Sequence, residues 1–431
     1  MSQRLPSLLA WPMTLLRTAV TWMARSPARS FIVIFLLGFS IRVVLLAQVP
    51  ERRILPNDRW EDTATATSLV ERGQFADPYL IPTGPTAHLP PFVPGILALC
   101  WSLFGMGLAG GYAVYLFSIT AFSTLYALVP WFGGKLGLSR EAGVLGGIVG
   151  SVIVVGAGNR EDIAGIFIGL MAIAFLRRWT SGLGSIGGSL LLGAACGVAF
   201  HLQPVLLPVV LGWMIFELWW CRDRRKWLLL GVIVLGMVIA CVPWGWRNYR
   251  VFNEVFFIRS NLGLELRMAN HEGAVGAIDA MDPQEYQHPR TKVEEAQLVL
   301  ELGEAEYMRR AKVEAVDWIR ANPGNFLGLT TSRLTQFWLG PMYRPGTALL
   351  VTTLTILALL GAWASLPAMT HPQRAALLMP LIFYPLIYYV VAYMPRYRVP
   401  LDWILLLLAG AAVWSWVDGA AKVAGSASRS A

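Results

Sequence analysis

Three acidic residues, Asp58, Glu61 and Asp62, follow the first strongly apolar segment of the chain. They open a polar stretch over 50–91 that ends in a Gly-Pro-Thr-Ala-His-Leu-Pro-Pro run containing His88. A carboxylate at the mouth of a membrane helix can take a proton from a substrate hydroxyl group, which is general-base catalysis. A carboxylate-rich loop can also be an ordinary solvated surface. Composition alone leaves both interpretations open.

Arginine residues at the ends of apolar segments could bind an anionic group. Arg396 and Arg398 flank Tyr397 in a turn bounded by prolines, and Arg247 closes an earlier apolar segment. A guanidinium group can form paired hydrogen bonds with phosphate oxygens. Anchoring at the membrane surface also explains such arginines. The positive-inside rule disfavours arginines on an outer face, so an outer location of Arg396 and Arg398 would favour an anionic partner.

A third charged group, Arg160-Glu161-Asp162, lies in a short turn between two apolar segments. Arg160 and Asp162 could lie near a bound sugar, but the mixed signs favour a local ion pair. His88 could line the path of an acceptor. The simpler expectation for His88 is a turn histidine without a catalytic role.

The composition identifies the class of protein. Of the 431 residues, 56% are hydrophobic and only 14% are charged, which predicts an integral membrane protein. We attribute the net charge of +9 to cytoplasmic loops and lipid head groups, since no basic run is interleaved with aromatic residues as nucleic-acid binding would need. The four cysteines have neither disulfide nor metal-ligand spacing, and no Gly-rich phosphate loop or nucleophile elbow is present.

Apolar stretches near the length needed to cross a membrane, about 20 residues, recur along the chain. They lie at 30–49, 109–132, 142–158, 162–177, 185–201, 203–220, 227–247, 347–367, 375–394 and 399–417. We therefore predict an all-α polytopic membrane protein with about ten transmembrane helices. Lys and Arg residues in the short loops agree on one orientation only if 92–106 and 325–341 lie along the outer surface. In that orientation 50–91, 248–324 and the Arg396 turn meet on one non-cytoplasmic face.

These features divide the chain into five segments. They are an N-terminal interfacial amphipathic segment (1–29), a transmembrane module with the first outer loop at 50–108 (30–247), a second outer loop with surface and interfacial helices (248–346), the last transmembrane helices (347–417) and a disordered cytoplasmic tail (418–431). Helical periodicity over 292–320 predicts one or two surface helices, with a break at Gly303 and a stop at Asn322-Pro323-Gly324.

Short sequence patches run across most of the chain in a consistent order. They are Trp60-Glu61-Asp62 with Ala66 and Gly73, Thr83 to Ala87 with Pro90-Pro91, Pro243-Trp244-Gly245-Trp246-Arg247, Trp318 to Pro323, and Arg396-Tyr397-Arg398-Val399-Pro400. Together they resemble the GT-C glycosyltransferases, and most of all the protein mannosyltransferase and aminoarabinose transferase-like branch, which uses polyprenyl-phosphate sugars.

The resemblance implies transfer of a hexosyl or pentosyl unit, with inversion, from a polyprenyl-phosphate donor. The acceptor would be a glycolipid such as lipid A, a cell-wall polysaccharide or a protein. The reaction would take place in a bacterial inner membrane, on the face toward the periplasm or exterior, with membrane lipids as further partners. Glu61 would activate the acceptor, with Asp58 and Asp62 assisting. Arg396, Arg398 and Arg247 would hold the phosphate.

The resemblance leaves the key carboxylate open. Aligning on Ala66 and Gly73 places it at Asp58 or at Glu61, and the flanking Trp60 favours Glu61. The loop acids could also hold a divalent cation, although the sequence shows no complete ligand set.

Two other functions compete with a glycosyltransferase. A transporter or lipid flippase would place ionisable residues near the bilayer midplane, whereas the centres of most predicted spans are free of charge. A non-catalytic membrane scaffold with the same fold would tolerate substitution of all three acids without a change in membrane abundance.

Overall fold

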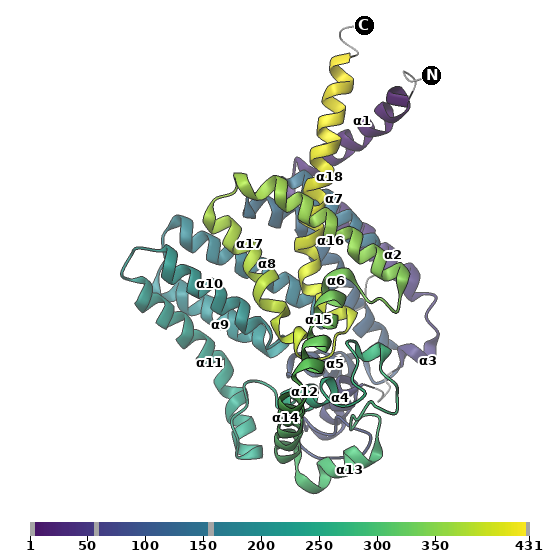
Figure 1. The fold of residues 1–431 in the computed structure, drawn as a ribbon, viewed down its shortest axis with the longest axis vertical. Coiled ribbons are helices and arrows are strands. Elements are labelled where there is room, and N and C mark those ends of the chain that lie inside the picture. The colour runs from purple at the N-terminus through teal and green to yellow at the C-terminus, as the bar shows by residue number, and fades with distance from the viewer. Residues whose placement is uncertain (1–4, 56–59, 154–158, 428–431) are drawn as a thin grey trace.

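The computed structural model describes residues 5–55, 60–153 and 159–427, and this part of the chain is built from helices without a β-strand (Figure 1). Six of its helices are long and apolar enough to cross a membrane. They are α2 (Pro27–Leu46), α6 (Leu108–Leu136), α8 (Asn159–Ser181), α11 (Lys226–Phe252), α16 (Pro345–Ser365) and α18 (Val399–Ala427). The protein is an integral membrane protein, as its composition predicts.

Shorter helices occupy the other predicted spans. They are α7 (Arg140–Val152), α9 (Ile186–Leu202), α10 (Leu206–Trp220) and α17 (His371–Phe383), which continues into the 3-10 turn η3 (Tyr384–Tyr389). The longest of these α-helices, α9, has 17 residues and reaches about 26 Å, somewhat less than the roughly 30 Å of a hydrocarbon core. The all-α polytopic class is confirmed, and the number of ten spans stays a prediction.

Helix α18 lies at the centre of the bundle. Its residues Leu401 to Leu408 are all buried, as expected of a helix that is apolar on every side. Neighbouring helices approach it through glycines. A Cβ atom on Gly361 of α16 would collide with the Leu408 carbonyl, and one on Gly410 would collide with the Ala142 carbonyl of α7. Such close backbone contacts are how membrane helices pack without a hydrophobic driving force.

The outer loops fold into short helices at one end of the bundle, opposite the two chain termini (Figure 1). The first loop contains α3 (Glu51–Ile54), α4 (Glu61–Arg72) and α5 (Phe92–Phe104), and the second contains α12 (Leu262–Ala269), η1 (Ile278–Ala280), α13 (Val293–Leu302), α14 (Glu304–Ala321) and α15 (Pro323–Leu339). The 13 residues of α5 span about 20 Å, less than a hydrocarbon core, and the surface location of 92–106 stays a prediction.

The second loop divides where the sequence predicts. Helix α13 ends at Leu302 and α14 begins at Glu304, with Gly303 between them at a φ of 78°, a left-handed conformation that favours glycine. The predicted stop at Asn322-Pro323-Gly324 is the junction of α14 and α15.

The ends of the chain differ in part from the prediction. Helix α1 (Leu5–Ala24) forms where an amphipathic helix is expected, and it packs against α18 through an ion pair between Arg17 and Asp418 of 2.9 Å. Helix α18 continues to Ala427, so the disorder predicted from 418 onward is wrong up to that residue. A helix in which Ala and Gly dominate can continue when its first turns are anchored by packing.

A buried carboxylate joins the two loops. Glu304 accepts hydrogen bonds from the Ala87 amide (2.8 Å) and the Ser260 hydroxyl (2.6 Å), and also from the Thr86 hydroxyl. Burial raises the pKa of Glu304, and these three donors oppose that rise. From α11, Arg247 donates to the carbonyls of Thr86 (2.6 Å) and Phe75 (2.9 Å). Thr86 and Ala87 of the first loop are therefore held by Glu304 from the second loop and by Arg247 from α11.

We expect Glu304→Ala to destabilise the protein, by about 1–3 kcal/mol for each buried donor left unpaired. Glu304→Gln should cost much less, because the amide keeps an acceptor oxygen and no longer buries a charge. Thermal unfolding in detergent measures both, with the exposed Glu301→Ala as the matched control. Equal stability of Glu304→Ala and Glu301→Ala would contradict the role of Glu304 in joining the two loops.

Candidate active site between the loops

The first turn of α4 places two acidic side chains side by side. Trp60 is in an extended conformation before the helix, and Glu61 and Asp62 are its first two residues. Negative charge is favoured at this end because the free backbone N–H groups point toward it. Asp58, the alternative carboxylate, lies outside the described residues.

Asp62 faces a group of cations. Its closest electrostatic partners are Arg160, Glu61, Arg396 and Glu161. Burial raises the pKa of Asp62, and the two arginines oppose the rise only in part. Within the described parts of the chain, no hydrogen-bond donor reaches its Oδ1 atom. Asp62 is therefore a half-buried carboxylate with one buried oxygen that accepts no hydrogen bond and with a raised pKa.

The Arg160-Glu161-Asp162 group forms the start of α8 and not a turn. Arg160 Nε lies 3.5 Å from Glu161 Oε1, which agrees with the predicted local ion pair. Arg396 Nε lies 3.8 Å from the same oxygen. Glu161 thus brings arginines from α8 and from the turn before α18 to one point beside Asp62.

The two arginines of the η4 turn (Pro395–Arg398) have different partners. Arg398 is buried, and its Nε lies 2.8 Å from Asp402 Oδ1, one helical turn further along. The Arg396 side chain remains 37% exposed. Between them, the Tyr397 ring stacks on Tyr388 at 4.3 Å. Arg396 is therefore the arginine of this turn that faces the space between the loops.

Arg259 joins the same cluster from the second loop and is a residue that the sequence analysis did not predict. Its electrostatic neighbours include Arg160 and Tyr397, and its Nη2 lies 3.3 Å from Glu265 Oε1. The preceding residue, Ile258, has a φ of 66°, a left-handed conformation that is costly for a β-branched side chain. This turn is held by bonds from α11 to the Ile258 carbonyl.

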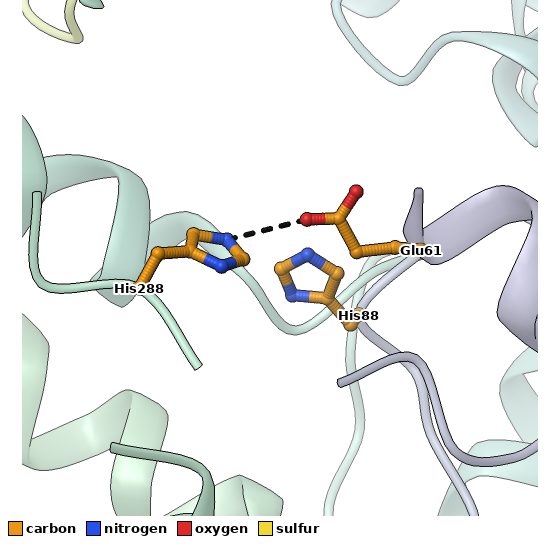
Figure 2. Close-up of side chains that lie close together, drawn as sticks. All are labelled: Glu61, His88 and His288. Carbon is orange, nitrogen blue, oxygen red and sulfur yellow. Dashed lines mark ion pairs between the residues drawn. The ribbon is translucent and has the colours of Figure 1, made fainter. Parts of the chain in front are cut away.

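Glu61 points toward two histidines (Figure 2). Its Oε1 lies 3.5 Å from His288 Nε2, and His88 lies beside both. Both histidines are buried. Burial lowers the pKa of His288 to about 4 and holds the pKa of His88 well below its usual value, so both rings are neutral at pH 7. Tyr286 stacks on His288 with ring centres 5.6 Å apart.

The structure thus brings most of the predicted residues to one region, in two groups. Asp62, Arg160, Arg396 and Tyr397 belong to the cationic group, and Glu61 and His88 to the histidine group. Asp162 lies at the start of α8 and interacts electrostatically with Glu161 and with Arg42 of α2. Arg247 donates hydrogen bonds to carbonyls of the first loop, and Arg398 forms an ion pair with Asp402.

Comparisons with known proteins bear on the fold. No family model and no curated protein matches this chain. Among solved structures, the apo oligosaccharyltransferase of Archaeoglobus fulgidus superposes with a TM-score of 0.52 at 13% identity, covering 89% of this chain and 50% of that one. AglB from the same organism, in complex with an inhibitory peptide and a dolichol-phosphate, gives a TM-score of 0.51 at 12% identity, with 91% and 50% covered.

The chain has the GT-C fold. It spans about half the length of these oligosaccharyltransferases. ArnT from Cupriavidus metallidurans bound to undecaprenyl phosphate aligns over 89% of this chain and 77% of that one, at a TM-score of 0.34 and 13% identity. The resemblance drawn from the sequence patches is confirmed at the level of the GT-C fold.

Substitution of Arg398 and of Arg396 tests whether only Arg398 has a structural role. We expect Arg398→Met to destabilise the protein by about 3–5 kcal/mol, because it leaves a buried carboxylate without its partner. Arg396→Met should change stability little. Thermal unfolding compares the two, and the double variant Arg398→Met/Asp402→Leu should recover most of the loss. An equal loss of stability in Arg398→Met and Arg396→Met would contradict these different roles.

Proposed function

We propose that this protein is a glycosyltransferase that moves a sugar from a polyprenyl-phosphate carrier to an acceptor on the membrane face that bears the two loops. The observation that carries the proposal is the Asp62 carboxylate, whose Oδ1 atom is buried, beside Arg160 and Arg396, with Arg259 close to Arg160. Transfer from a lipid phosphate needs a base for the acceptor hydroxyl and cations for the departing phosphate. The cluster contains both.

The three arginines would hold the phosphate. Negative charge grows on its oxygens as the bond to the sugar breaks, and fixed cations in a water-poor site stabilise that charge most. Arg160, Arg259 and Arg396 come from three different segments and interact around Tyr397. Glu161 and Glu265 together neutralise only part of the charge of the three arginines. We assign Arg247 to the framework because it donates to two backbone carbonyls of the first loop, and Arg398 because it is buried and ion-paired with Asp402.

Asp62 is our first choice for the base. A carboxylate of raised pKa accepts a proton more readily, and its Oδ1 has no competing donor among the described residues. Glu61, favoured by the sequence, is the second choice because it faces the histidines. The two would act on opposite sides of the same helix start. Asp162 would assist from α8.

The similar structures support the class of carrier. AglB was solved with a dolichol-phosphate and an inhibitory peptide, and one ArnT structure holds undecaprenyl phosphate. For this chain we propose a polyprenyl-phosphate sugar as donor, inversion at the transferred carbon, and a glycolipid, polysaccharide or protein as acceptor. We propose the periplasmic or outer face of a bacterial inner membrane as the place of reaction.

The test is transfer of labelled sugar from a membrane lipid extract to endogenous acceptors by the purified protein in liposomes. We expect Asp62→Asn to reduce the rate about 100- to 10,000-fold, the range for loss of a general base. Glu301→Gln, on the exposed end of α13, is the matched control.

Each other outcome has a distinct meaning. A loss with Glu61→Gln but not with Asp62→Asn would assign the base to Glu61. Full activity in both variants would contradict the role of these acids. Absence of transfer from any carrier lipid by the wild type would contradict the glycosyltransferase itself and leave a transporter or a scaffold.

A further inference from the structure

We infer that Glu61, His88 and His288 form a binding site for a zinc-like transition metal ion between the two outer loops. The three side chains come from the start of α4, the end of the first loop and the second loop, and they point toward a common centre (Figure 2). The site involves no arginine of the cationic group. It is therefore distinct from the proposed phosphate site, although Glu61 and Asp62 are neighbours.

The separations suit one ion. Glu61, His88 and His288 each offer a ligand atom, and these atoms lie within 4.8 Å of one another. At metal–ligand distances of about 2.0–2.2 Å, tetrahedral ligands lie roughly 3.3 Å apart. The 3.5 Å between Glu61 Oε1 and His288 Nε2 is close to that value and is long for a hydrogen bond. Small side-chain rotations would close the remaining distance.

A second observation concerns the tautomer of His88. Its ring turns Nε2 toward the Glu61 carboxylate (Figure 2). The buried Nδ1 atom has no hydrogen-bond partner in the part of the chain that the structure describes, so no protein contact holds it as an acceptor. The ring can therefore carry its proton on Nδ1 and present an unprotonated Nε2 to a metal ion.

The chemistry of the donors selects the class of metal. Neutral imidazole nitrogen is a ligand for zinc and its neighbours in the transition series, whereas magnesium and calcium prefer oxygen ligands. Two histidines and one carboxylate are a known donor set for zinc with an open fourth position. A water molecule or a polar group of an acceptor could occupy that position.

Binding would change one hydrogen bond in a predictable way. The Arg290 amide donates to His288 Nδ1 at 2.9 Å, so in the metal-free protein the ring proton is on Nε2. A metal ion bound at Nε2 requires that proton on Nδ1, and the Arg290 amide then loses its acceptor. Metal binding is thus coupled to a change in the turn between Tyr286 and Arg290.

The direct test is the metal content of the full-length protein, purified without a polyhistidine tag. After treatment with a chelator and equilibration with zinc, we expect the wild type to retain about one ion per chain, as other sites with three protein ligands do. Zinc should raise its unfolding temperature more than magnesium does. The double variant His88→Gln/His288→Gln should lose at least about 100-fold in zinc affinity, since it removes two ligands.

His271→Gln is the matched control, because His271 is another histidine of the second loop, 3.8 Å from Glu285. It should bind zinc like the wild type. Unfolding temperatures of all variants in chelator show whether each has folded. Hydrogen exchange gives an independent reading, because zinc should speed exchange at Arg290.

The inference is overturned if the folded wild type binds zinc no more tightly than the double variant. It is also overturned if the control loses as much affinity as the double variant. These measurements use no sugar donor, so their outcome does not depend on the proposed transfer reaction.

Discussion

The buried carboxylate of Glu304 is the contact on which the arrangement between the loops depends. It binds donors from the first loop and from the segment before α12, while Arg247 holds the same first-loop backbone from α11. A buried carboxylate is costly unless its oxygens are bonded, and here three donors bond them. Because Thr86 and Ala87 precede His88, this contact also fixes where the histidine group forms.

The two adjacent acids of α4 have opposite surroundings. Asp62 lies beside arginines from α8 and from the η4 turn, and Glu61 faces neutral imidazoles. A helix start can separate neighbouring side chains in this way, because consecutive residues project about 100° apart. One short motif thus serves two chemical environments: a cationic group suited to a lipid phosphate and a nitrogen-rich group suited to a metal ion.

The sequence predicts the fold well and the partners of individual side chains poorly. Composition and periodicity were sufficient for the helical class and for the break at Gly303. The pairing of Arg398 with Asp402 could be predicted too, because they are four residues apart across the junction of η4 and α18. The position of Arg259 could not be predicted from the sequence, since it follows from the left-handed conformation of Ile258. His288 was missed because its neighbours Glu61 and His88 are distant in the chain.

The arginines of the cationic group are proposed to hold a lipid phosphate. The most direct test is to measure binding of a polyprenyl phosphate to the purified protein by native mass spectrometry. We expect Arg259→Gln/Arg396→Gln to weaken polyprenyl-phosphate binding by about 100-fold or more, since each arginine can give charge-assisted hydrogen bonds. Arg222→Gln/Arg224→Gln, before the opposite end of α11, should leave binding unchanged. Equal binding by the wild type and both double variants would contradict the account.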